Sequence, residues 1–296
     1  MLKLIAIVGP TGVGKTKLSI ALAKHYDAEI INCDAMQVYK GMDIGTAKVT
    51  TEEMEGIPHH LLSFVPVTRN YTVFDYQKDG RQVIDEIRSR GKNIILVGGT
   101  GLYLKALLYR YEFHEVPKIE HIEDLTLEEM LATLQREGVS LENVDVSNHR
   151  RVERLYTNVM AGVFPTKTGN ELLYDAVFIG LTTEREHLYS IIDTRVSKMI
   201  SDGLVDEVKS LLPYANDSKA LSTAIGYKEI ISYLEGDCTL EEAISLIQKN
   251  SRHYAKRQYT FFRHQLPVHW ISVCFDDFQK TIQEAIDWIT KENSSR

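Results

Sequence analysis

The 296-residue chain has few cysteines, no excess of positive charge and no long apolar run. Its three cysteines, Cys33, Cys238 and Cys274, lie far apart and form no CxxC pair, which argues against a zinc site and against a disulfide framework. The apolar run of residues 4–8 is far too short to cross a bilayer or to act as a signal peptide. These absences predict a soluble protein of a reducing compartment, most simply the cytoplasm, with no membrane partner.

The charge balance is mildly acidic, since 34 lysines and arginines stand against 41 aspartates and glutamates, giving a net charge of −7. This excludes a protein coated in positive charge, although a local basic groove for nucleic acid remains compatible with it. Hydrophobic residues form 44% of the chain and charged residues 25%, which is typical of a folded globular protein.

Short apolar segments alternate with segments of helical spacing along much of the chain. The predicted strands are residues 2–8, 29–33, 93–97, 174–181 and 268–273. This alternation predicts an α/β fold whose parallel sheet is flanked by helices. The pattern breaks after residue 110 with an acidic segment, a short helical pattern and the basic run 149–154. We therefore expect a core of residues 1–110 and 172–296, interrupted by a small α-helical insertion domain at 111–171.

A phosphate-binding motif follows the first predicted strand and opens a helix, which is the context that a P-loop requires. Its glycines allow backbone N–H groups to point inward and to form an anion site with the helix N-terminus. Lys15 adds a positive charge, and the Thr16 hydroxyl is placed to ligate Mg²⁺. A turn that only connects strand to helix is disfavoured because every motif position is filled. The predicted phosphate-binding residues are Gly9, Pro10, Thr11, Gly12, Val13, Gly14, Lys15 and Thr16.

Two other strand ends differ from those of a P-loop ATPase, which usually holds Mg²⁺ with an aspartate after an apolar strand. Strand 93–97 ends instead in Gly-Gly-Thr, and Asp34 follows strand 29–33. Because ligands bind beyond the carboxyl ends of parallel strands, Lys15, Asp34 and Thr100 should converge on one crevice. Asp34 is then placed to accept a proton from a nucleophile. The alternatives are an outer ligand of Mg²⁺ and an ordinary turn aspartate.

The glycines of segment 98–101 allow two interpretations. They either serve the turn alone or admit a bulky ligand close to the backbone, with the Thr100 hydroxyl bonded to that ligand.

Residues 252–264 contain no acidic residue and interleave cations with aromatic side chains. On a helix, Arg252, Lys256 and Arg263 lie near one face, which suits a phosphodiester backbone. A solvated face opposite packed aromatics is the alternative. The second basic run at 149–154 favours nucleic-acid binding, although neither segment carries a named binding motif.

Taken together, these segments resemble the tRNA dimethylallyltransferases, also called tRNA isopentenyltransferases, of the bacterial type in the IPP transferase family. The resemblance rests on GPTGVGKT (9–16), DAMQVYKGMDIGTAK (34–48), PHH (58–60), VGGTGLY (97–103), AIGYKE (224–229) and AKRQYTFFR (255–263). It implies a P-loop NTPase-like core that binds dimethylallyl diphosphate in place of ATP. The implied acceptor is the N6 amine of adenosine 37 in the anticodon stem-loop of tRNA, and a monomer is the family expectation.

The resemblance also implies roles for individual residues. Asp34 would be the general base on the flipped adenine, Thr100 would contact that adenosine, and Lys15 would bind the diphosphate, with Mg²⁺ as cofactor at Thr16. The implied tRNA contacts are Asp34, Ala35, Met36, Gln37, Thr100, Arg150, Arg151, Arg154, Arg252, Lys256 and Arg257. One departure concerns the donor, because Thr223 stands where many members have a diphosphate-binding arginine. The segments 146–148 and 154–157 also depart from the family pattern.

Two other functions explain part of the sequence. A small-molecule kinase accounts for the P-loop and Asp34, and would release ADP. A non-catalytic nucleotide- or RNA-binding module would bind its ligands without forming a covalent product.

Overall fold

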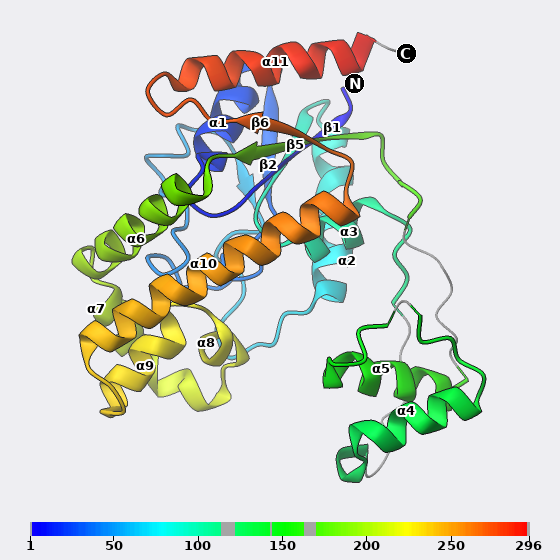
Figure 1. Ribbon diagram of the computed structural model, residues 1–296. Coiled ribbons are helices and arrows are strands. Elements are labelled where there is room, and N and C mark those ends of the chain that lie inside the picture. Colours follow the sequence, from blue (N-terminus) through cyan, green and yellow to red (C-terminus); the bar gives the residue numbers. More distant parts are fainter. Residues whose placement is uncertain (1, 114–121, 143, 163–169, 295–296) are drawn as a thin grey trace. The chain divides into compact units, whose positions relative to one another are not determined.

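The computed structural model describes residues 2–113, 122–142, 144–162 and 170–294. Within these residues, six parallel strands form one sheet in the order β3-β2-β4-β1-β5-β6 (Figure 1). They are β1 (Leu4–Val8), β2 (Ala28–Asn32), β3 (His59–His60), β4 (Asn93–Val97), β5 (Ala176–Thr182) and β6 (Val268–Ser272). This order places the carboxyl ends of β2, β4 and β1 side by side, where a parallel sheet binds its ligands.

Successive residues of a strand point to opposite faces of the sheet, and apolar cores bury both faces. In β1, Leu4, Ala6 and Val8 belong to one apolar core, and Ile5 and Ile7 belong to the other. Figure 1 shows α1 and α11 together on one side of the sheet, and these helices supply the second core. The first core is covered by α2 and α3 and continues into the helices α7 to α10.

Helices surround the sheet in this part of the chain (Figure 1). They are α1 (Lys15–Tyr26), α2 (Val73–Ser89), α3 (Gly101–Leu108), α6 (Arg185–Ser201), α7 (Leu204–Leu211), α8 (Lys219–Thr223), α9 (Tyr227–Glu235), α10 (Leu240–Gln265) and α11 (Phe278–Ser294). Among the helices that the structure describes, none combines the length and the apolar character needed to cross a membrane.

The contacts between residues divide the chain into two compact units, Met1–Tyr109 with Leu172–Arg296, and Arg110–Glu171. The second unit contains α4 (Leu127–Arg136) and α5 (His149–Met160). Thr126 caps α4 by accepting a hydrogen bond from the Glu129 N–H. A small core of its own joins the two helices, formed by Met130, Leu134, Val152 and Val159.

The predicted fold class is confirmed: a parallel α/β sheet of the P-loop type with helices on both faces and a small helical unit. The strand bounds differ slightly, since β2 begins at Ala28 and β5 begins only at Ala176. The sequence reading missed β3, because two residues are too few to produce a periodic pattern.

An ion-pair cluster fixes this edge of the sheet. Glu29 of β2 is buried and accepts hydrogen bonds from Arg90 at 2.7 and 3.2 Å and from His60 of β3 at 2.6 Å. The hydrogen bonds from Arg90 are the main reason why the pKa of Glu29 lies below its usual value. The ionised carboxylate therefore stabilises the fold above the pKa of an unfolded glutamate, and this contribution is lost as the pH falls.

Glu29→Gln should lower the free energy of unfolding by about 1 kcal/mol at neutral pH, because Arg90 is half exposed and its pair is partly screened. Urea unfolding at neutral pH and at about pH 3.5 checks this. Protonation of Glu29 at the lower pH should reduce the difference in free energy of unfolding between the wild type and the variant. Glu235→Gln, an exposed glutamate, is the matched control. A difference that stayed constant with pH would contradict the assignment.

Candidate active site

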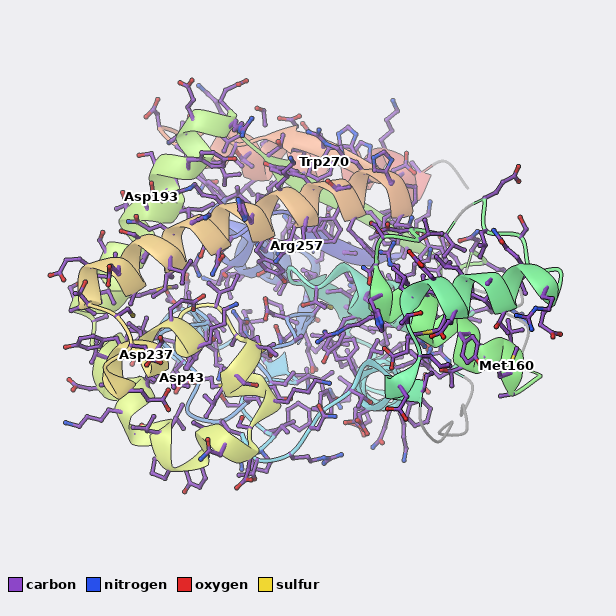
Figure 2. All side chains as sticks on the ribbon, turned by 60° about the horizontal axis from the view of Figure 1, so that its bottom comes forward. Asp43, Met160, Asp193, Asp237, Arg257 and Trp270 are labelled. Atoms are coloured by element: carbon purple, nitrogen blue, oxygen red, sulfur yellow. The ribbon has the colours of Figure 1, made fainter. Side chains whose placement is uncertain are left out.

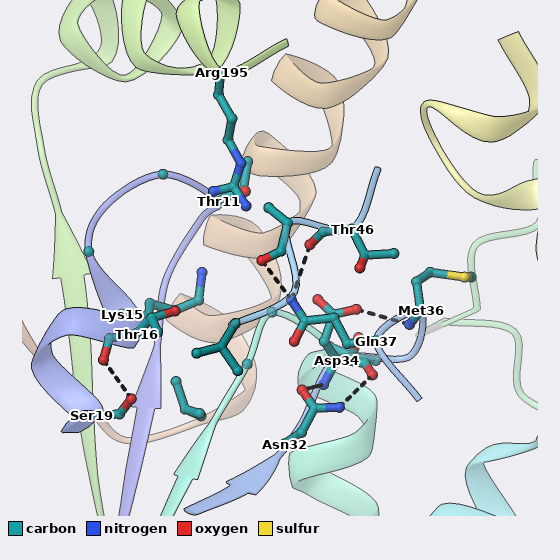
Figure 3. Close-up of a pocket in the computed structure, with 18 of the residues that line it drawn as sticks. Thr11, Lys15, Thr16, Ser19, Asn32, Asp34, Met36, Gln37, Thr46 and Arg195 are labelled. Atoms are coloured by element: carbon teal, nitrogen blue, oxygen red, sulfur yellow. Dashed lines mark hydrogen bonds between the residues drawn. The ribbon is translucent and has the colours of Figure 1, made fainter. Parts of the chain in front are cut away.

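A cavity of about 1040 Å³ lies beyond the carboxyl ends of β1, β2 and β4. Lys15, Asp34 and Thr100 all line this cavity, so their predicted convergence is confirmed. Figure 3 shows Lys15 and Thr16 at the start of α1 and Asp34 in the loop after β2. The wall also includes other predicted residues: Thr11, Gly12, Gly14, Thr16, Ala35, Met36, Gln37 and Arg257. The remaining P-loop residues, Gly9, Pro10 and Val13, are buried.

The P-loop leads into a helix whose first turn carries no side-chain cap. The Leu18 N–H donates to the Gly14 carbonyl as the first bond of α1, so the preceding N–H groups are open to an anion. The Lys15 ammonium donates to the Pro10 carbonyl at 2.7 Å. Burial lowers the pKa of Lys15 to about 7, with Arg195 adding to this effect and Asp34 opposing it.

Thr16 is the residue whose chemistry fits the predicted magnesium site. Ser19 donates to the Thr16 carbonyl at 2.9 Å, whereas no described residue is hydrogen-bonded to the Thr16 hydroxyl. Mg²⁺ commonly takes one or two protein oxygens and completes its shell with substrate phosphates and water. The described residues contain no cluster of three His, Cys, Asp or Glu side chains that could hold a metal. A magnesium ion at Thr16 would therefore need phosphate oxygens of a ligand to complete its shell.

The Asp34 carboxylate is oriented by its own loop. Its Oδ1 accepts the Met36 N–H at 2.9 Å, and the Asn32 amide bonds both the N–H and the carbonyl of Asp34 at 3.1 Å. The other carboxylate oxygen, Oδ2, has no hydrogen-bond partner among the described residues and lies near Gly99. One oxygen thus fixes the side chain, and the second is available to accept a proton.

The ends of β2 and β4 touch, and this contact positions Thr100. The Thr100 N–H donates to the Cys33 carbonyl at 3.1 Å, and the Thr100 hydroxyl oxygen accepts the Ala35 N–H at 3.0 Å. A Cβ at Gly98 would lie only 2.3 Å from the Cys33 carbonyl group. Glycine is therefore required at this position by the close approach of two backbones.

The space beside the other glycines of this segment is also filled by the protein. A Cβ at Gly99 would lie 2.2 Å from Gln258, and one at Gly101 would lie 2.2 Å from Phe261. Gly98 and Gly99 also line the cavity, so the interpretation that these glycines admit a bulky ligand stays a prediction. Gly99 and Gly101 in addition allow α10 to pack against the turn after β4.

Two site residues that the sequence reading missed come from α10. The Gln258 amide donates to the Gly99 carbonyl at 3.0 Å, and the Tyr254 hydroxyl is hydrogen-bonded to the side chains of Thr100 and Gln258. Burial raises the pKa of Tyr254 to about 12, and the negative charge of Asp34 adds to this. Their spacing of four residues, which places both on one helix face inside the basic segment, was the available signal.

A carboxylate on α7 holds the loop that carries the predicted RNA contacts. Glu207 accepts the backbone N–H groups of Asp43 at 3.0 Å, Ile44 at 2.8 Å and Gly45 at 3.1 Å, and also the Tyr227 hydroxyl at 2.6 Å. Charge-assisted bonds of this kind are about twice as strong as neutral ones. Glu207 thus anchors the middle of the segment 34–48 to the helical layer.

The anchored loop in turn holds Gln37. The Gln37 amide donates to the carbonyls of Thr46 at 3.1 Å and Ala47 at 3.4 Å, as Figure 3 shows. The predicted contact residue is therefore oriented by backbone groups next to the Glu207 anchor.

The predicted RNA-binding cations of α10 differ in their surroundings. Arg252 pairs with Asp193 of α6 and lies 5.8 Å from the centroid of the Tyr189 ring, so it joins two helices. Lys256 is exposed, and Arg257 lies 5.6 Å from the Tyr254 ring centroid at the cavity. Figure 2 shows Arg257 near the middle of α10 and Asp193 on the neighbouring helix.

The other predicted RNA-binding arginines lie on α5 of the second unit. Arg150, Arg151 and Arg154 are exposed there, and Arg151 lies 3.8 Å from Asp145. Their contact with tRNA stays a prediction.

Comparison with known proteins gives consistent matches over almost the whole chain. A sequence profile of the family described as "IPP transferase" matches residues 37–265. A tRNA dimethylallyltransferase of Anoxybacillus flavithermus is 43% identical, covering 97% of this chain and 96% of the relative. One from Enterococcus faecalis is 39% identical, covering 99% and 100%.

Solved structures agree with these matches. A tRNA isopentenylpyrophosphate transferase from Bacillus halodurans superimposes with a TM-score of 0.79 at 39% identity, covering 99% of this chain and 97% of the other. A eukaryotic dimethylallyltransferase acting on tRNA gives a TM-score of 0.83 at 27% identity, covering 98% and 80%.

The parallel sheet, the P-loop and the cavity at the strand ends define an α/β protein of the P-loop class. Within that class, the matches are specific: this chain belongs to the IPP transferase family.

Glu207→Gln should speed amide hydrogen exchange at Asp43, Ile44 and Gly45 by about tenfold or more, because the loop loses its charged acceptor. Mass spectrometry of exchange in the full chain measures this. Asp206→Asn, an exposed neighbour on the same helix, should leave these amides unchanged. Equal exchange in Glu207→Gln and the wild type would show that the carboxylate does not hold the loop.

Proposed function

We propose that this chain is a tRNA dimethylallyltransferase. It transfers the dimethylallyl group of dimethylallyl diphosphate to the N6 amine of adenosine 37 in the tRNA anticodon stem-loop, giving N6-(dimethylallyl)adenosine and diphosphate. Relatives with 39–43% identity over nearly their full length carry this name, which supports the reaction and the acceptor.

The observation that carries the proposal is the pairing of two groups in one cavity. The P-loop with Lys15 and the Asp34 carboxylate, whose Oδ1 accepts the Met36 N–H, line the same cavity, and β4 is followed by Gly-Gly-Thr without the carboxylate of an ATPase. Such a cavity suits a diphosphate leaving group and a nucleophile that must lose a proton.

The reaction follows from the electronic needs of its two substrates. The adenine amine is a poor nucleophile because its lone pair is delocalised into the ring. As the nitrogen bonds to the allylic carbon, the carbon–oxygen bond to diphosphate breaks and its electron pair leaves with the diphosphate. The amine proton passes to Asp34, while Lys15 and the open amides of α1 stabilise the departing charge.

Thr16 would hold Mg²⁺, which would supply further charge on the diphosphate when bound. The adenine must leave the base stack to reach the cavity, at a cost of a few kcal/mol. Cations of α10, together with Arg150, Arg151 and Arg154 of the second unit, would bind the phosphates of the anticodon arm. We further propose a monomer that acts in the cytoplasm, where its acceptor is made.

The proposal is tested with purified protein, unmodified anticodon stem-loop RNA, dimethylallyl diphosphate and Mg²⁺. The mass of the RNA should rise by one dimethylallyl group, and digestion should place that group on adenosine 37. An RNA of unchanged mass, or ADP released from ATP with a small acceptor, would reject the function.

Asp34→Asn should lower the single-turnover rate by about 10²- to 10⁴-fold, the range of general base catalysis. The amide retains an oxygen for the Met36 N–H, so the loop and the affinity for RNA should be preserved. Quenched-flow experiments under single-turnover conditions measure the rate, and titration with RNA measures the affinity. A wild-type rate in the variant would remove the assigned role.

Diphosphate binding should take up protons above neutral pH, because Lys15 has a pKa of about 7 in the free protein and the anion favours its charged form. At about pH 8 we expect uptake approaching one proton, whereas at about pH 6 Lys15 is already charged. Calorimetry in two buffers of different ionisation enthalpy measures the uptake. Lys15→Arg stays charged throughout and reports the proton changes of the ligand alone. Equal uptake by the variant and the wild type would contradict the assignment.

A further inference from the structure

Arg195 is a half-buried cation that has no hydrogen-bond or ion-pair partner in the described part of the chain. It lies on α6 and lines the active-site cavity. In contrast, Arg90 is paired with Glu29, and Arg252 is paired with Asp193. A partly desolvated guanidinium is normally paired, and it offers five N–H donors. The donors of Arg195 are therefore available to a ligand in the cavity.

Direct contact between α6 and the P-loop fixes the place of this side chain. Gly12 has a φ of 88°, and a Cβ there would lie 2.6 Å from Cγ2 of Ile191. Arg195 follows Ile191 by four residues, which is one helical turn along the same face. Figure 3 shows Arg195 extending from α6 toward the P-loop. The guanidinium thus reaches the P-loop from α6, near Thr11 (Figure 3).

Lys15 and Arg195 are two like charges that line one cavity, and the carboxylates of Asp34 and Glu53 line it as well. Burial lowers the pKa of Lys15, and the charge of Arg195 lowers it further, while burial lowers the pKa of Arg195 as well. Thr223, on the same wall, carries no charge. An anion between Lys15 and Arg195 would remove their repulsion and would supply the acceptors that Arg195 lacks.

We propose that Arg195 binds the diphosphate of the prenyl donor together with Lys15 and stabilises it as it leaves. The inference rests on the proposed function, and it assigns to this chain the cation that Thr223 does not provide. As the carbon–oxygen bond of the donor breaks, its electron pair moves to the diphosphate. The planar guanidinium can bind two of its oxygens at once, which the Lys15 ammonium cannot do.

A phosphate of the RNA is the other anion that an arginine could bind. The donor is favoured because Arg195 shares the cavity with Lys15 and Thr11 and lies one turn from the contact with Gly12. An RNA contact predicts a different kinetic effect, so the experiment separates the two.

The experiment measures binding of inorganic diphosphate with Mg²⁺ to the full chain by calorimetry. Arg195→Gln should weaken this binding by about 10- to 100-fold, as expected for bonds to a charged group. The affinity of Arg195→Lys for diphosphate should lie between those of the wild type and Arg195→Gln, because lysine keeps the charge but cannot bind in a bidentate manner. Lys198→Gln removes an exposed charge of the same helix that pairs with Asp202, and should change binding by less than about twofold. Thermal unfolding establishes whether each variant is folded. If Arg195→Gln is not folded, Arg195→Met takes its place.

Steady-state prenyl transfer supplies the second readout. Arg195→Gln should lower kcat/KM for the donor by about 100-fold or more while leaving the KM for RNA unchanged. Wild-type diphosphate affinity in the Arg195 variants, or an effect on the KM for RNA alone, would overturn the inference. If the wild-type protein binds diphosphate through Arg195 but modifies no RNA, the proposed function fails and the anion site stands. If it modifies RNA but the Arg195 variants match it, only the inference fails.

Discussion

The contact between the ends of β2 and β4 is the constraint on which the active site depends. The Cys33 carbonyl accepts the Thr100 N–H, and Gly98 leaves no room for a side chain between the two backbones. This brings Asp34, at the end of one strand, beside Thr100, at the end of the next. The P-loop lies after β1, the neighbour of β4 in the sheet. Sheet order and this close contact therefore bring three chain segments that are distant in sequence to one cavity.

The electrostatics of the cavity run against those of the whole molecule. The chain carries a net charge of −7, yet Lys15, Arg195 and Arg257 line the cavity. Lys15 and Arg195 are partly buried, so their charges are less screened than they would be in water. The local arrangement of charges in the cavity therefore differs from what the overall composition indicates.

The sequence was sufficient for the parts of the site that follow strand ends. Lys15, Asp34 and Thr100 were predictable because a parallel sheet collects its carboxyl ends at one edge. Arg195 and Gln258 were not, because they lie on helices that reach the cavity only through tertiary packing. Glu207 was not predictable either, because α7 meets the loop 43–45 only in the folded chain. Arg195 left one signal: a cation beside positions 191, 192 and 196, which are apolar and lie on neighbouring faces of α6.

For the fold, the core strands were predictable to within about two residues because continuous β-branched runs mark buried strands. The two-residue β3 was not, since its pairing with β2 rests on the local path of the chain before His59 and on the Glu29 cluster. The roles of the individual cations on α10 could not be predicted from the sequence pattern either. Arg252 had the spacing of an RNA contact, but the structure pairs it with Asp193.

That pairing ties together two helices of the cavity wall. Asp193 stands two residues before Arg195 on α6, and Arg252 belongs to α10, which also supplies Tyr254 and Gln258 to the cavity. Sliding of α6 past α10 would separate the carboxylate from the guanidinium, so the ion pair opposes a change in the width of the cavity.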